Sequence, residues 1–171
     1  ILGPPRNGHW RIIMISVKNL FKSFNGFQAV NGLSFDIVPG EVVGFLGPNG
    51  AGKSTTMKML TGFLLPTSGD IHISDLSFKH SALEIKKKIG YLPEGAPAYG
   101  DMTTLQFLSF IARVRGYKGT EKAARIQRVV EQVELQEVLD KPIDNLSKGF
   151  KRRVGLAQAL IHDPEILILD E

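Results

Sequence analysis

Short apolar runs bounded by glycine, proline or asparagine alternate along this chain with longer segments in which apolar residues recur at helical spacing. The short runs predict strands, and the longer segments predict amphipathic helices. Strands are expected at residues 12–17, 33–37, 42–46, 70–73, 89–92 and 166–169. Asn25 and Gly26 predict a turn between the first two strands, and the strand at 42–46 is expected to be buried between Gly40 and Gly47.

Helical spacing dominates the second half of the chain. Two pairs, Ser81 with Glu84 and Thr103 with Gln106, have the spacing of a capping box and predict helix starts. Gly62 is placed to end the helix that begins near residue 54. Further helices are expected over 81–88, 103–116, around 126–133, and 147–162.

Together these elements predict an α/β fold. A core sheet of the phosphate-loop NTPase type is expected, with an antiparallel β part at the N-terminal end. A helical stretch interrupts the core before its strands resume at residue 166, so we expect an inserted α-helical subdomain over about residues 95–163.

Composition narrows the class of protein. The chain has 171 residues, of which 43% are hydrophobic, enough for a folded core. No apolar run reaches the roughly 18 residues of a transmembrane helix, and the chain contains no cysteine for disulfides or thiolate metal sites. The net charge of +4 is modest and its basic clusters are short, so we expect solvated faces and no nucleic-acid partner. The four histidines lack metal-ligand spacing, so no metal beyond a nucleotide's Mg²⁺ is expected.

The two ends of the chain are unlike the rest. Residues 1–13 have no periodicity and are interpreted as a non-native or unstructured leader, with Met14 as a plausible start. At the other end the chain stops after an apolar strand and two carboxylates. We therefore expect the domain at 14–171 to be C-terminally incomplete, and the fragment alone to be inactive.

The clearest chemical motif is the segment at 47–54, which satisfies G-x-x-x-x-G-K-[ST]. A predicted strand precedes it and a predicted helix follows it, as a phosphate-binding loop requires. Glycines let successive N–H groups point into one concavity, and the helix N-terminus adds partial positive charge. The motif predicts a nucleotide site in which Lys53 reaches the phosphates and the Ser54 hydroxyl can bind Mg²⁺; an accidental glycine-rich turn is the alternative.

Two further sites have both a chemical and a purely structural interpretation. Asp170 and Glu171 follow an apolar strand, where one carboxylate can hold Mg²⁺ and the other can orient water, or both can belong to an acidic turn. Ser147 and Gly149 precede a helix, where they can bind a γ-phosphate or serve only as an N-cap and a flexible turn. The residues alone leave the second pair of interpretations open.

The ordered combination of the phosphate loop, the segment Leu-Ser-x-Gly, "RRVGLAQAL" and "LILDE" resembles the ATP-binding subunit of an ABC transporter, over residues 15–171. The resemblance implies that Asp170 is the Walker B aspartate, Glu171 the catalytic glutamate, and Phe24 an adenine-stacking aromatic; packing in the core is the alternative for Phe24. The Walker A loop would comprise Gly47, Pro48, Asn49, Gly50, Ala51, Gly52, Lys53, Ser54 and Thr55.

Three positions, one in a loop and two in the signature, depart from the family pattern. Glu94 stands where the family most often has glutamine; its carboxylate would still contact ATP, Mg²⁺ or water, unless it is only a solvated loop acid. In the signature at 146–150, Lys148 and Phe150 replace the usual glycine and glutamine, while Ser147 and Gly149 are retained. This combination is similar to bacterial exporters whose permease is a separate protein.

The resemblance implies an ATPase with ATP and Mg²⁺ as cofactors. It would form a head-to-tail dimer, expected to be a homodimer, with ATP held between Walker A of one subunit and the signature of the other. Hydrolysis would power a separate membrane permease, which places the protein peripherally on the cytoplasmic face of the membrane. A soluble non-transport ABC ATPase, or a phosphate-loop kinase or GTPase, remains an alternative.

Overall fold

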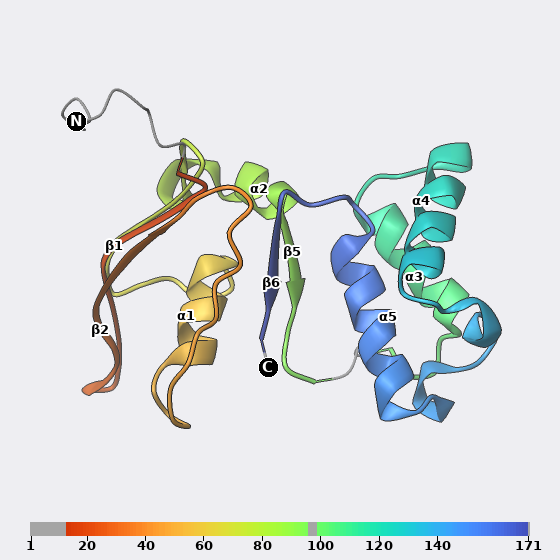
Figure 1. The fold of residues 1–171 in the computed structure, drawn as a ribbon, viewed down its shortest axis with the longest axis horizontal. Coiled ribbons are helices and arrows are strands. Elements are labelled where there is room, and N and C mark those ends of the chain that lie inside the picture. Colours follow the sequence, from red (N-terminus) through yellow and green to blue (C-terminus); the bar gives the residue numbers. More distant parts are fainter. Residues whose placement is uncertain (1–12, 96–98, 171) are drawn as a thin grey trace. The chain divides into compact units, whose positions relative to one another are not determined.

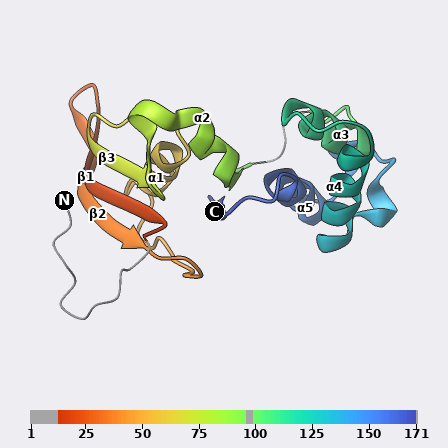
Figure 2. The ribbon, with the colours of Figure 1, turned by 90° about the horizontal axis from the view of Figure 1, so that it is seen from above.

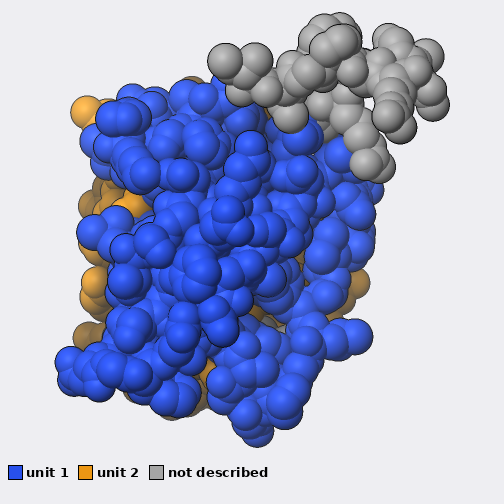
Figure 3. All heavy atoms as spheres, turned by 90° about the vertical axis from the view of Figure 1, so that its left-hand side faces the viewer, with its two compact units in different colours: residues 1–85 blue, residues 86–171 orange. Residues whose placement is uncertain are grey.

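The computed structural model describes residues 13–95 and 99–170. The chain divides into two compact units, residues 1–85 and residues 86–171, drawn in different colours in Figure 3. Within the described residues, the first unit is built on an antiparallel sheet, and the second on a parallel pair of strands with helices beside it. None of the helices in these ranges combines the length and apolar character needed to cross a membrane.

The sheet of the first unit has the strand order β2-β1-β3-β4, with every pairing antiparallel. Asn25 and Gly26, with φ values of 45° and 88°, form the predicted turn between the first two strands. The first strand begins at Ile15 rather than at residue 12, and both strands extend to the turn, because the backbone ladder continues through polar positions and the buried side chains of Leu20 and Val30. The strands are β1 (Ile15–Phe24), β2 (Phe27–Ile37), β3 (Ser68–Ile73) and β4 (Leu76–Ser77).

Helix α1 (Lys53–Leu60) lies beside this sheet in both views of the ribbon (Figures 1 and 2). Thr56, Met59 and Leu60 form its buried face. The chain leaves the helix through Gly62, whose φ of 69° agrees with the predicted helix end.

The prediction of a buried strand at 42–46 is wrong for this structure. No described strand pairs with this segment, and the side chains of Val42 and Leu46 are 98% and 96% exposed. A strand is stable only when a neighbour takes up its backbone N–H and C=O groups. An apolar run therefore marks a segment suited to a sheet, whereas the partner decides whether the strand forms.

Helix α2 (Phe78–Lys88) begins three residues before the predicted start at Ser81. Ser81 interrupts the helix with φ −132° and ψ 37°, so the expected boundary is present as a kink. The position of Ser81 therefore coincides with the break, whereas the preceding turn of helix was not predicted.

The second unit contains the parallel strands β5 (Ile89–Leu92) and β6 (Ile166–Leu169), both as predicted. Among the described residues between them lie three helices and two short 3₁₀ segments, and the helices pack together in Figure 2. These are α3 (Thr104–Val114), α4 (Gly119–Gln132), η1 (Gln136–Val138), η2 (Ile143–Asn145) and α5 (Lys148–Leu160).

Apolar positions at helical spacing form the core of this unit. Phe107, Leu108, Val129 and Val154 come from three different helices and are at most 1% exposed. The capping box at Thr103 is confirmed: the Gln106 N–H donates to Thr103 Oγ1 at 3.2 Å, and the Thr103 N–H donates to the Gln106 side chain at 3.0 Å.

His162 follows α5 and is 8% exposed. Its Nε2–H donates to the Ile89 carbonyl at 3.0 Å, because a carbonyl can only accept. Nδ1 is buried and has no hydrogen-bond partner among the described residues. Burial and the positive charge of Arg115 lower the pKa of His162 from 6.5 to about 4, so the ring is held neutral.

This burial predicts acid sensitivity of the second unit. Between pH 6.5 and about pH 4 the unfolded chain binds the His162 proton and the folded chain does not, so stability should fall as the pH falls through that window. The loss from this group is at most about 3 kcal/mol and stops below pH 4. Urea unfolding across this range should give a shallower pH dependence for His162→Gln; an unchanged slope would contradict the assignment.

Candidate functional site

The glycine-rich loop at 47–52 enters α1 without a side-chain cap. Gly52 occupies the N-cap position, and no side chain bonds the free N–H groups of the first helical turn there. That turn also contains no acidic residue. The helix N-terminus therefore retains its partial positive charge and its donors, which suits an anionic ligand.

Gly52 is required by space as well as by conformation. Its φ is 85°, and a Cβ built on it would clash with the Ala29 carbonyl oxygen of β2. The start of α1 therefore rests directly on the backbone of the sheet. Gly50 has a similar φ of 84°, but a Cβ there would meet nothing within 4 Å.

Lys53 places its ammonium group in the loop. Nζ donates to the carbonyl oxygens of Gly47 at 2.7 Å and Pro48 at 2.9 Å. These two contacts hold a positive charge beside the loop backbone. Ser54 and Thr55 follow in the first turn of α1 and are half-buried.

The predicted aromatic, Phe24, lies at the turn end of β1 and faces Phe27 across the hairpin. Its side chain is 44% exposed, and Lys22 Nζ lies 5.0 Å from its ring centroid. The alternative of core packing is not supported by this exposure. The sequence analysis did not name Phe27 as a candidate for stacking. Its side chain is 66% exposed, and the alternation of side chains along β2 was the only indication of that exposure.

In the second unit, parallel pairing brings Glu94 and Asp170 to one sheet edge. Leu92 pairs with Leu169, so both carboxylates follow the carboxyl ends of neighbouring strands. The Asp170 N–H continues the ladder by donating to the Leu92 carbonyl at 3.0 Å. Asp170 is 7% exposed, whereas Glu94 is exposed, and Glu171 lies outside the described residues.

The sequence reasoning missed Tyr91, which contacts Asp170 directly. The Tyr91 hydroxyl donates to Asp170 Oδ2 at 3.2 Å. Burial, together with the Asp170 charge and this hydrogen bond, raises the pKa of Tyr91 to about 12, so the hydroxyl keeps its proton. Tyr91 pairs with Ile168, two residues before Asp170, and this position on the neighbouring strand was the available signal.

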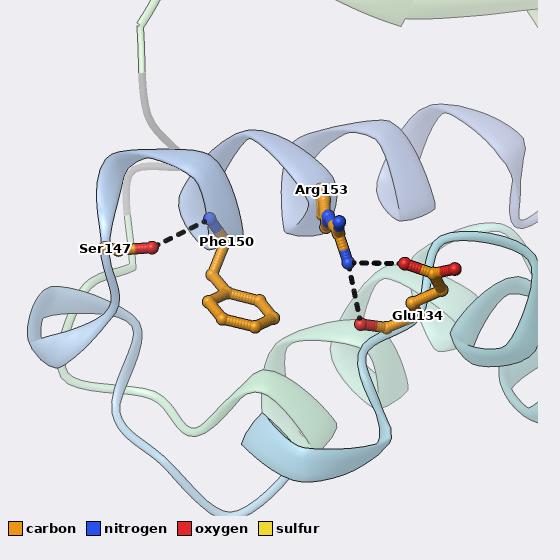
Figure 4. Close-up of polar contacts among 4 residues, drawn as sticks. All are labelled: Glu134, Ser147, Phe150 and Arg153. Atoms are coloured by element: carbon orange, nitrogen blue, oxygen red, sulfur yellow. Dashed lines mark hydrogen bonds and ion pairs between the residues drawn. The ribbon is translucent and has the colours of Figure 1, made fainter.

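Helix α5 presents the predicted signature at its N-terminus. Ser147 is the N-cap, and its Oγ accepts from the Phe150 N–H at 3.3 Å (Figure 4). A Cβ on Gly149 would meet only Ser147 Oγ, at 3.9 Å, so no packing within the unit requires glycine there. The N-cap interpretation is thus confirmed for Ser147, while nothing local accounts for Gly149.

The packing of α5 on β5 sets its direction. Gly90 approaches the carbonyl oxygen of Ala159, and Gly155 approaches the side chain of Leu92. Helix α5 therefore runs antiparallel to β5, with its N-terminus toward the carboxyl end of the strand. Ser147 precedes Gly155 by eight residues, about 12 Å of helix, so the signature projects beyond the edge that carries Asp170.

Much of the positive charge of α5 has acidic partners. Arg153 Nη1 donates to both the side chain (2.9 Å) and the carbonyl (3.3 Å) of Glu134, and its guanidinium lies 5.5 Å from the Phe150 ring centroid (Figure 4). Lys151 Nζ lies 4.0 Å from a carboxylate oxygen of Asp144. Such pairs agree with the expectation that this basic run belongs to a solvated face.

The candidate site residues thus fall into two groups, one on each unit. The first unit carries Phe24 and the loop from Gly47 to Thr55. The second carries Glu94, Asp170 and the N-terminus of α5, assembled at one end of the parallel strands. The first group offers hydroxyl oxygens, and the second offers carboxylate and hydroxyl oxygens, all of which can bind Mg²⁺.

Known proteins share these features. Residues 30–171 match the sequence pattern of the ABC transporter family. The chain is 40% identical over 158 residues to the probable multidrug ABC transporter ATP-binding protein YbhF of Escherichia coli, and 43% identical to the uncharacterized ABC transporter ATP-binding protein YxlF of Bacillus subtilis. Each alignment covers 92% of this chain, which spans 27% of the first relative and 52% of the second.

A solved structure agrees with the fold. The structure of cbiO1 from Clostridium perfringens, described as part of the ABC transporter complex cbiONQ, matches with a TM-score of 0.81 at 30% identity. The match covers 93% of this chain and 65% of that one. The chain therefore belongs to the ABC transporter family and has the mixed α/β fold of its ATP-binding proteins, with an antiparallel sheet and helices.

The contact between Gly52 and β2 can be tested by adding one methyl group. Gly52→Ala should lower the free energy of unfolding by about 2–4 kcal/mol, from a left-handed alanine and a backbone clash together. Gly50→Ala is the matched control, because it has the same strain without the clash and should cost only about 1–2 kcal/mol. Equal losses in denaturant unfolding would contradict the close approach to Ala29.

Proposed function

We propose that residues 14–171 form an ATP-binding domain, with a helical subdomain over about residues 95–163, that binds and hydrolyses ATP to power transport. The observation that carries the proposal is the loop at 47–53, where an uncapped helix N-terminus and the Lys53 ammonium converge. Membership of the ABC transporter family supports the same conclusion.

In this proposal the first unit binds the nucleotide. The loop amides and Lys53 exchange their present surroundings for phosphate oxygens and neutralise their charge. Phe24, exposed at the hairpin end, stacks on the adenine ring through its face. Ser147 and Gly149 bind the γ-phosphate of a nucleotide held by a second subunit; the open space beside Gly149 suits this close approach.

The residues present fit a magnesium ion. Asp170 is a nearly buried carboxylate that accepts a neutral hydrogen bond from Tyr91, and a cation would compensate its buried charge more fully. Asp170 and Ser54 would hold the ion, with Glu94 contacting it directly or through water. When bound, Mg²⁺ supplies charge neutralisation to the phosphate oxygens.

We assign the water-activating role to Glu171. Its carboxylate accepts a proton from water as the water oxygen attacks the γ-phosphorus. The bond from that phosphorus to the β–γ bridging oxygen then breaks, which releases ADP and phosphate. Lys53 and the loop amides stabilise the negative charge that leaves with ADP.

The transport role follows from the family and from relatives whose names describe ATP-binding proteins of transporters. We propose a head-to-tail homodimer that closes on two ATP molecules and opens after hydrolysis, driving a separate membrane permease. The protein then lies on the cytoplasmic face of the membrane. A soluble ABC ATPase without a permease is the second candidate, and it would show no permease-dependent change in turnover.

Lys53→Ala should weaken ATP binding by about 10- to 150-fold, because a charged hydrogen bond is worth about 1.5–3 kcal/mol. Calorimetric titration of the full-length protein with ATP measures the loss. Lys58→Ala removes an equal charge from the last turn of the same helix and should bind ATP like the unaltered protein. Equal affinity of the two variants would overturn the role of Lys53.

Glu171→Gln should retain ATP binding and lose at least about 100-fold in turnover, since it removes the proton acceptor. Light scattering should then detect a doubling of molar mass on addition of ATP. Adding Gly149→Ala to this variant should prevent the doubling without lowering thermal stability, because the methyl group meets no packed atom of its own unit. A dimer that forms equally well in the doubly substituted protein would refute the signature contact.

A further inference from the structure

Tyr91 is tied to Asp170 through a side-chain contact that no motif describes. Its hydroxyl donates to Asp170 Oδ2 at 3.2 Å, and the Asp170 N–H donates to the carbonyl of the adjacent Leu92 at 3.0 Å. Two successive residues of β5 therefore fix both the backbone and the carboxylate of Asp170. The pairing of Tyr91 with Ile168 and of Leu92 with Leu169 sets this geometry.

We infer that Tyr91 is a positioning residue that orients the Asp170 carboxylate toward the Mg²⁺ of bound nucleotide; this inference rests on the proposed function of Asp170. A carboxylate rotates freely between two broad orientations about its terminal torsion. A donor fixed on the neighbouring strand favours one orientation. The tyrosine engages Oδ2, so Oδ1 is the oxygen left without this bond.

The Tyr91 hydroxyl has the properties of a hydrogen-bond partner that orients a metal-binding side chain. Loss of such a partner typically costs about 10- to 100-fold in metal affinity. At 3.2 Å this hydrogen bond is longer than the usual range for hydroxyl donors, so we expect a smaller effect of about three- to tenfold. The hydroxyl also lies beside a carboxylate that is only 7% exposed, where few water molecules can replace it.

A purely structural role for Tyr91 makes a different prediction. The ring is half-buried at the sheet, and phenylalanine would keep that packing while removing the hydroxyl. If the ring alone matters, Tyr91→Phe should behave like the unaltered protein in every measurement. If the hydroxyl positions Asp170, the change should appear only when the metal is present.

The test measures ATP binding by the full-length protein carrying Glu171→Gln, with Mg²⁺ titrated from zero. Tyr91→Phe should raise the Mg²⁺ concentration for half-maximal binding about three- to tenfold. Its affinity for ATP in excess chelator should be unchanged. Tyr117→Phe is the matched control, because it removes a hydroxyl from a ring packed against Arg125 and should leave the Mg²⁺ requirement unaltered.

Asp170→Asn separates the two proposals. Loss of the Mg²⁺ response in Asp170→Asn, together with the shift in Tyr91→Phe, supports both. A second outcome is that Asp170→Asn loses the Mg²⁺ response while Tyr91→Phe is indistinguishable from the Tyr117→Phe control. This result overturns the positioning role of Tyr91 and is consistent with the proposed function. An unchanged Mg²⁺ response in Asp170→Asn overturns the role of Asp170 itself, and with it the inference for Tyr91.

Discussion

Backbone meets backbone at Gly52 and Gly90, where a Cβ would clash with the carbonyl oxygens of Ala29 and Ala159. Each contact sets a helix directly on a strand, α1 on β2 in the first unit and α5 on β5 in the second. Side chains repack when a residue changes, whereas two main chains in contact have nothing that can move aside. The positions of the phosphate loop and of the signature, each within its own unit, depend on these two approaches.

Parallel pairing of β5 and β6 has a second consequence. Because both strands run the same way, Glu94 and Asp170, which are far apart in the chain, both follow the carboxyl ends of the paired strands. The direction of α5 brings the signature beyond the same edge. Acidic and anion-binding features are thereby gathered on the second unit, while the lysine and the helix N-terminus that suit phosphates lie on the first.

One buried and one half-buried polar side chain of the second unit have specific roles that the hydrophobic pattern does not reveal. His162 is held neutral by burial and bonds the first residue of β5, whereas Tyr91 bonds the residue after β6. Both act between elements far apart in the chain. Neither residue belongs to a recognisable motif, because their function comes from a neighbour that only the strand register supplies.

Local chemistry was sufficient to predict the turn at Asn25 and the capping box at Thr103, and it offered the N-cap at Ser147 as one of two interpretations. These features depend on residues a few positions apart, whose conformational and capping preferences can be read from the sequence. The strand expected at 42–46 required a partner, the contact of Tyr91 with Asp170 required a register, and the need for Gly52 required the carbonyl of Ala29. The sequence therefore determined the elements and the chemical groups they carry. Tertiary structure decided which of them pair and which groups meet, because hydrogen-bond partners and close contacts are supplied by segments distant in the chain.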